Sequence, residues 1–249
     1  MSLQSEFAAA ERAALVTVVA GGQHARLLVR PDQSVEGSLG SPELDAAALT
    51  FAEELMWAER SERREVGDVS LFIDVVAPPP RLIMFGAVDF AGALARMARA
   101  AGWRPYVIDP RGRFATRERF PDAEEIVVAW PEEAIVRIGG IDRATYLAVL
   151  THDPKLDDAA LELAVRSDAA YIGAMGSRRA QEKRRERLLE RGLTEEELAR
   201  IAAPIGLDLG GLTAEETALS IMSEVVAVRN GREGGRLSHA KGRIHEVGT

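Results

Sequence analysis

Three consecutive prolines, Pro78 to Pro80, constrain the fold of this 249-residue chain more than any other feature. Proline fixes φ at about −65° and has no backbone N–H, so the run continues neither a helix nor an inner strand. It forms a stiff, extended connection instead. We therefore predict two domains, a small one over residues 1–77 and a larger one over residues 78–249.

In the larger domain, short apolar runs alternate with segments of helical spacing. The runs predict strands at Leu82–Phe85, Pro105–Ile108, Glu125–Ala129, Thr145–Leu150 and Ala169–Ala174. The other segments predict helices at Phe90–Ala101, Pro131–Ile138, Lys155–Arg166, Ser177–Arg191, Thr194–Ala202 and Thr213–Arg229. Strands that are apolar throughout and separated by helices are typical of a buried parallel sheet. The predicted fold class is α/β, with a Rossmann-like parallel sheet domain and a smaller N-terminal α+β domain.

The small domain combines strands with one helix. Two β-rich runs on either side of Gly21-Gly22, Leu15–Ala20 and Arg26–Val29, predict a hairpin. Ser41 and Pro42 form an N-cap and a first-turn proline, and apolar residues at helical spacing extend this helix to about Arg64. The alternating stretch Ser70–Val76 predicts a further strand.

The composition excludes several function classes. The chain contains no cysteine, so disulfides, thiolate nucleophiles and cysteine–zinc sites are excluded. Its net charge of −8 argues against a nucleic-acid binder, because such proteins neutralise phosphates with a basic face. The longest apolar runs fall well short of the roughly 20 residues that a membrane span needs. Since Glu6 and Glu11 also interrupt the stretch where a signal peptide needs an apolar core, we expect a cytoplasmic protein without nucleic-acid or membrane partners.

The first glycine turn of the larger domain is Gly86-Ala87-Val88-Asp89, and Asp109 follows Gly86 by 23 positions, at the end of the next strand. This is the frame of a dinucleotide site, in which a middle glycine lets the backbone approach the pyrophosphate. Here Val88 occupies that place, and Asp89 brings a negative charge to the helix N-terminus. We therefore do not expect NAD(P) as a cofactor and interpret the turn as part of a nucleotide-type fold with a closed or altered pocket.

A second glycine turn has better features for binding an anion. It runs from Gly173 through Gly176 into a helix, with Ser177 at the N-cap and Arg178 in the first turn. Free backbone N–H groups, the helix dipole and a guanidinium fork all suit a phosphate. The alternative is an ordinary capped helix with solvated arginines.

His152 and Asp153 end the strand at Leu150, and in a parallel sheet such residues point into the crevice where ligands bind. A histidine beside an aspartate there can act as an acid–base group or contact a ligand. The alternative is a capping and packing role. The sequence contains neither a nucleophile–histidine–acid set nor a cluster with metal-ligand spacing, so we expect no built-in metal site.

Several separated stretches, taken together and in order, resemble the XdhC/CoxI family of molybdenum-cofactor chaperones, which act in the maturation of xanthine and carbon-monoxide dehydrogenases. These stretches are Gly86-Ala87, Val107 to Arg111, Leu150 to Asp153, Tyr171 to Arg179, Pro204 to Gly210, Glu215 to Glu224 and the closing Ile244-His245.

The resemblance implies an accessory factor rather than an enzyme, with a molybdenum hydroxylase of the xanthine or CO dehydrogenase type as partner. It implies binding of the pterin cofactor, molybdopterin or the molybdenum cofactor, and we expect a homodimer. The implied cofactor-binding residues lie at the ends of the predicted strands and are Gly86, Asp109, Arg111, His152, Asp153, Gly173, Gly176, Ser177 and Arg178.

The chain departs from the family pattern in three places, one of which is the absence of a later cysteine-glycine segment. Glu43 stands about where the family has a cysteine, and the family's Gly-Ala-Gly-His turn has become Gly86-Ala87-Val88-Asp89. A role that needs a thiolate to hold molybdenum or to transfer sulfur therefore cannot be carried by this chain. Two other classes stay open: an NAD(P)-binding oxidoreductase of Rossmann type, and a cofactor-free paralogue that binds only protein.

Overall fold

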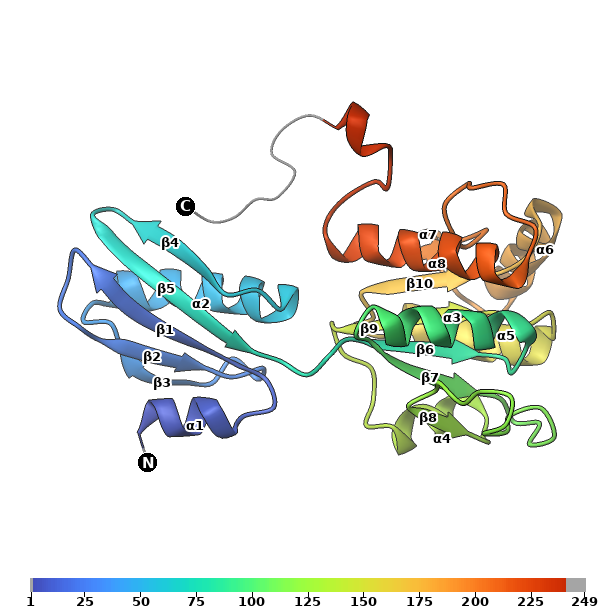
Figure 1. The fold of residues 1–249 in the computed structure, drawn as a ribbon, viewed down its shortest axis with the longest axis horizontal. Helices are drawn as coiled ribbons and strands as arrows, with labels where there is room; N and C mark the ends of the chain where they lie inside the picture. Colours follow the sequence, from blue (N-terminus) through green and yellow to red (C-terminus); the bar gives the residue numbers. More distant parts are fainter. Residues whose placement is uncertain (1, 241–249) are drawn as a thin grey trace. The chain divides into compact units, whose positions relative to one another are not determined.

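The structure is a computed structural model that describes residues 2–240 (Figure 1). The chain divides into two compact units, and the second of them is Pro79–Gly235. Residues Arg236 to Ala240, which we had expected in the larger domain, lie outside that unit. The Ile244-His245 stretch of the family resemblance lies outside the described residues.

The unit that precedes Pro79 is a five-stranded antiparallel sheet with two helices. Its strands lie in the order β3-β2-β1-β5-β4. The elements are α1 (Leu3–Ala9), β1 (Ala13–Ala20), β2 (Arg26–Val29), β3 (Val35–Ser38), α2 (Pro42–Ala58), β4 (Glu62–Val66) and β5 (Val69–Val76). The predicted hairpin around Gly21 is confirmed, since β1 pairs with β2 in antiparallel register.

Each face of this sheet is covered by one helix. Ala48, Ala52 and Leu55 of α2 are fully buried and pack in one apolar cluster with strand residues such as Val16 and Ile73. On the other face, the α1 side chains Leu3 and Phe7 pack against a smaller cluster of buried strand residues. Alternating strand residues therefore serve both faces, as the pleat of a strand requires.

The prediction that the helix beginning at Ser41 and Pro42 continues to about Arg64 is wrong. The helix α2 ends at Ala58, and Glu59 adopts a left-handed conformation with φ 54°. Residues Glu62–Val66 instead form β4, which pairs with β5 along its whole length. Charged residues dominate this segment and fit the solvated side of an edge strand, so its partner strand decides the conformation.

The second unit is a parallel six-stranded sheet in the order β11-β10-β9-β6-β7-β8, which confirms the predicted Rossmann-like α/β fold. The strands are β6 (Arg81–Phe85), β7 (Arg104–Ile108), β8 (Glu125–Val127), β9 (Thr145–Val149), β10 (Tyr171–Ala174) and β11 (Ile201–Ala202). The helices are α3 (Asp89–Ala100), α4 (Pro131–Arg137), α5 (Pro154–Val165), α6 (Arg178–Glu190), α7 (Glu195–Ala199) and α8 (Ala214–Arg229). The short 3₁₀ turn η1 (Leu237–His239) comes after the last residue of this unit.

Helices cover both faces of this sheet, as expected for a buried parallel sheet. In β6, Leu82 and Met84 point into the cluster formed with α3 and α8, which lie side by side in Figure 1. Ile83 and Phe85 point into the opposite cluster, formed with α4, α5 and α6. All four side chains are fully buried, so the continuous apolar run of β6 reflects burial on both sides.

The predicted helix Thr194–Ala202 is wrong in its second half. The helix α7 ends at Ala199, and Ile201 and Ala202 form the edge strand β11. This strand pairs in parallel with Ile172 and Gly173 of β10. Two residues are too few to give a strand pattern in the sequence, and the exposed edge of β10 decides their conformation.

The order of the strands locates the crevice of the sheet. From β6 the chain moves outward through β7 and β8, and then returns to the other side of β6 with β9. In such open sheets ligands bind beyond the carboxyl ends of the strands where the order reverses. Most of the predicted site residues lie in the segments that follow β6, β7, β9 and β10. These segments all begin at this edge of the sheet.

Candidate functional site

Position 86, at the end of β6, must be occupied by glycine because two chain segments approach each other closely there. Its φ is +112°, a conformation that side-chain-bearing residues rarely adopt. A Cβ atom at this position would lie 2.2 Å from Cγ2 of Thr151, which follows β9. The glycine of the first turn therefore lets the ends of β6 and β9 come together.

Asp109, at the end of β7, is fully buried and uses both carboxylate oxygens within the protein. It accepts hydrogen bonds from the backbone N–H of Ala87 (2.9 Å) and of Arg111 (2.9 Å) and a bidentate pair from the Arg111 guanidinium (2.8 and 2.7 Å). Burial alone would raise the pKa of Asp109, but these hydrogen bonds outweigh it and hold the pKa below its ordinary value. Asp109 thus fixes the glycine turn and Arg111 and has no oxygen exposed for a ribose hydroxyl.

Arg111 lies at the edge of the crevice, where its hydrogen bonds to Asp109 hold its guanidinium in place. Its side chain is 38% exposed, and its guanidinium carbon lies 5.0 Å from the centre of the Phe114 ring. The hydrogen bond to Asp109 raises the pKa of Arg111, and the negative charge of Asp153 adds to this effect. Arg111 and Asp153 therefore interact electrostatically across the end of β6.

The start of α3 lacks the features of a pyrophosphate site. Val88 is the N-cap residue and offers no side-chain hydrogen bond. Asp89 is highly exposed and forms an ion pair with Arg119 (2.9 Å), which also donates a hydrogen bond to the Ala87 carbonyl (3.0 Å). The carboxylate that was expected to repel phosphate is thus partly neutralised, while Val88 keeps the place of the missing glycine.

The two residues after β9 differ in their surroundings. Asp153 is the N-cap of α5, and its carboxylate accepts a hydrogen bond from the Lys155 backbone N–H (3.0 Å). The side chain of His152 is exposed at the crevice edge. The capping alternative therefore describes Asp153, whereas His152 is free to face a ligand.

Gly173 lies within β10 and is explained by packing. A Cβ atom there would lie 2.4 Å from Cδ1 of Ile205 and 2.6 Å from the hydroxyl of Tyr171. The residue is buried and pairs with Ala202 of the edge strand. Gly173 is the next-to-last residue of β10, and its lack of a side chain makes room for Ile205.

The second glycine turn opens α6 as predicted. Gly176 has φ +135°, and Ser177 caps the helix by accepting a hydrogen bond from the Ala180 backbone N–H (3.3 Å). Arg178 is exposed and forms no hydrogen bond or ion pair with any residue from 2 to 240. The first turn of α6 carries no acidic residue, so its N-terminus and Arg178 together form a positively charged end.

A buried polar network beneath these turns was not predicted from the sequence. Thr151 donates a hydrogen bond to Asp157 of α5, and Arg184 of α6 donates one to the same carboxylate (2.8 Å). All three side chains are buried, and burial raises the pKa of Asp157 against the lowering effect of its two donors. A signal did exist, because Asp157 and Arg184 stand at positions where helical spacing places buried apolar residues.

This network joins the segments that follow β9 and β10. The Arg184 guanidinium also donates to the Met175 carbonyl (3.0 Å) and to the side chain of Gln181. Gln181 in turn donates to the carbonyls of Ala174 (3.1 Å) and Gly176 (3.3 Å). The relative position of the His152 and Ser177 segments is therefore set by Arg184 and Asp157.

A second network, also not predicted from the sequence, holds the segment after β11. Glu224 of α8 accepts hydrogen bonds from the Tyr171 hydroxyl and from the Gly206 backbone N–H (2.7 Å). Burial and the Glu224 hydrogen bond raise the pKa of Tyr171. The stretches Tyr171 to Arg179, Pro204 to Gly210 and Glu215 to Glu224, which carry the family resemblance, thus meet in one place.

The family models agree with this geometry. Residues 82–225 match the model of the XdhC Rossmann domain, and residues 7–67 match that of the XdhC and CoxI family. The chain belongs to the XdhC/CoxI family. The matched segments fall within the second and the first unit, respectively.

Three curated relatives share sequence with this XdhC/CoxI chain. It is 29% identical over 236 residues to the uncharacterized protein YqeB of Escherichia coli, covering 88% of this chain and 43% of the relative. It is 29% identical to a probable xanthine dehydrogenase subunit of Bacillus subtilis, covering 64% and 46%. It is 30% identical to the molybdenum cofactor insertion chaperone PaoD of Escherichia coli, covering 61% and 41%. The matches therefore span less than half the length of each of these relatives.

A solved structure shares the fold. The crystal structure described as a xanthine dehydrogenase from Bacillus halodurans matches 96% of this chain and 65% of its own, with a TM-score of 0.61 and 22% identity. Among residues 2–240, no helix has the length and apolar character of a membrane span, and no three acidic or histidine side chains gather as metal ligands would.

Proposed function

We propose that this XdhC/CoxI-family chain is an accessory protein that assists the maturation of a molybdenum hydroxylase of the xanthine or CO dehydrogenase type. The relatives named as a molybdenum cofactor insertion chaperone and as a probable xanthine dehydrogenase subunit support this role. The observation that carries the proposal is the joining of the family's separated motifs at one edge of the sheet, where Arg178 offers an unpaired guanidinium beside a helix N-terminus.

The ligand of this edge is the pterin cofactor, held by its phosphate group. The donor set suits a phosphate, because Arg178, the first N–H groups of α6 and the partly exposed Arg111 are all positive or hydrogen-bond donating. Gly176 and Ser177 shape the turn, His152 faces the ligand from the end of β9, and Asp153 holds the start of α5 beside it as its N-cap. Gly86 and Asp109 act indirectly, since they hold the neighbouring turn and Arg111 in place.

Molybdenum, when bound, supplies the redox chemistry of the partner enzyme, and this chain has no thiolate with which to ligate it. Its residues bind and orient the organic part of the cofactor. We therefore assign a thiol-free part of maturation to this chain, as a carrier or docking factor. The homodimer and the cytoplasmic location expected from the sequence belong to the same proposal.

An oxidoreductase that uses NAD(P) is the weaker candidate. The order of the six strands is that of dinucleotide-binding folds, which favours it. Val88 at the glycine position and the four hydrogen bonds that saturate Asp109 count against it.

We expect Arg178→Ala to weaken binding of a phosphorylated pterin by about tenfold to hundredfold, because it removes a charge-assisted hydrogen bond of ~1.5–3 kcal/mol. His152→Ala should weaken binding less, since His152 orients the ligand. Isothermal titration calorimetry on the full chain measures both effects.

Lys183→Ala is the matched control for this titration. Lys183 is exposed on the same helix, one turn beyond the N-terminus, so its loss removes an equal charge away from the site. We expect its affinity to equal that of the wild type. Unchanged affinity in Arg178→Ala would reduce the motif to a capped helix and contradict the proposed site.

A further inference from the structure

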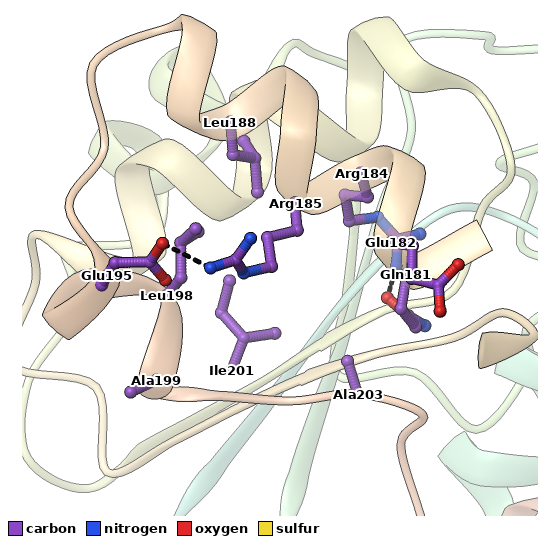
Figure 2. Close-up of a pocket in the computed structure, with 10 residues that line it drawn as sticks. All are labelled: Gln181, Glu182, Arg184, Arg185, Leu188, Glu195, Leu198, Ala199, Ile201 and Ala203. Atoms are coloured by element: carbon purple, nitrogen blue, oxygen red, sulfur yellow. Dashed lines mark hydrogen bonds and ion pairs between the residues drawn. The ribbon is translucent and has the colours of Figure 1, made fainter. Parts of the chain in front are cut away.

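A pocket of about 340 Å³ lies between α6, α7 and the edge strand β11, and none of the proposed pterin-binding residues lines it (Figure 2). Its volume lies in the range of about 300–1,000 Å³ that small-molecule sites occupy. The half-buried side chains of Leu198 and Ile201 form an apolar surface inside it, and the buried Leu188 also belongs to the lining. An apolar surface with a few converging polar groups is the usual composition of a ligand site.

One cation faces this apolar surface. Figure 2 shows the side chain of Arg185 reaching from α6 across the pocket towards Glu195 of α7, with which it forms an ion pair. The two side chains are 53% and 65% exposed, and ion pairs between such exposed groups contribute little free energy. One Nη atom of Arg185 makes this pair, and its other N–H groups have no partner among the residues that the structure describes.

Two other charged side chains line the pocket, and neither of them pairs with Arg185. Arg184 is neutralised by its buried contact with Asp157. Figure 2 shows the carboxylate of Glu182 turned away from Arg185. The pocket therefore presents one guanidinium with unused donors, one weakly held carboxylate at Glu195, and an apolar surface next to both.

We propose that this pocket binds a small organic anion with an apolar body. The anionic group pairs with Arg185 in place of Glu195, and the apolar body covers Leu198 and Ile201. This site is separate from the proposed pterin site, and its test involves no pterin. The two proposals can therefore fail independently.

Anilinonaphthalenesulfonate, an aromatic body with one sulfonate, serves as the probe, and its fluorescence is titrated with the full chain. Arg185→Gln should weaken binding about tenfold, at the lower end of the loss for a charge-assisted hydrogen bond. Glu195→Gln should tighten binding roughly twofold to fivefold, because it removes the competing carboxylate of an exposed ion pair. Ala199→Trp, at an exposed helix position that lines the pocket, should abolish binding there by filling the space.

Lys183→Gln is the matched control, since it removes a cation from α6 at a position that does not line the pocket. Its affinity should equal that of the wild type. An equal loss in Lys183→Gln and Arg185→Gln, or weaker binding in Glu195→Gln, would overturn the proposal. So would full binding in Ala199→Trp, which would place the probe at other apolar groups such as the exposed Leu209 and Leu212. Arg185 and Glu195 are exposed, so their variants keep the fold.

Discussion

Gly86→Ala is expected to destabilise the second unit by about 2–6 kcal/mol, through backbone strain and overpacking together. The new Cβ atom would lie 2.2 Å from Cγ2 of Thr151 and 3.3 Å from its backbone nitrogen, so a side-chain rotation alone does not relieve the contact. The φ of +112° adds strain for any residue other than glycine. The ends of β6 and β9 must separate to accept the methyl group.

Urea unfolding followed by circular dichroism measures this loss, and Gly102→Ala is the control. Gly102 also has a positive φ, of +81°, but no atom lies within 4 Å of the added Cβ. Its substitution should cost only the conformational term, about 1–2 kcal/mol. Equal losses at the two positions would mean that the approach of Thr151 to Gly86 is not what requires the glycine.

Arg184→Met should destabilise the second unit by about 3–5 kcal/mol, the cost of breaking a buried ion pair by removing one partner. The substitution leaves the carboxylate of Asp157, which is 2% exposed, without its guanidinium. It also removes donors to the Met175 carbonyl and to Gln181. We expect weaker pterin binding as well, since the segments after β9 and β10 lose their common anchor.

Two further variants separate the buried pair from a general loss of charge. Adding Asp157→Asn to Arg184→Met should recover part of the stability, because it removes the unpaired charge. Arg191→Met breaks an exposed ion pair between the same two helices, with Glu162, and should leave the unfolding midpoint almost unchanged. If the double variant is less stable than Arg184→Met, the unpaired carboxylate of Asp157 is not the cause of the destabilisation.

The strands β6, β7, β9 and β10 of the parallel sheet could be predicted because their apolar runs are long enough to show burial on both faces. The β4 and β11 strands could not, for different reasons. Glu62–Val66 carries four charged residues, and its conformation is set by pairing with β5. Ile201–Ala202 is shorter than any pattern, and pairing with β10 makes it a strand.

The position of the candidate site could be predicted from the sequence, but the contacts that each of its residues makes could not. Motifs at the ends of successive strands had to meet, because the strands are parallel. That Asp109 binds Ala87 and Arg111, and that Gly173 makes room for Ile205, depends on side-chain contacts between distant segments. Asp157 and Arg184 likewise form their ion pair across 27 positions of the chain. In the sequence they are visible only as two charged residues on otherwise apolar helix faces.

The central claim is that the chain carries the pterin cofactor at the edge formed by Arg178, Gly176 and the end of β9. Native mass spectrometry of the protein purified from a host that makes the molybdenum cofactor tests it most directly. We predict a bound phosphorylated pterin in the wild type, retained in Lys183→Ala and lost in Arg178→Ala. A wild-type protein that carries no pterin under these conditions, or that carries NAD(P) instead, would contradict it.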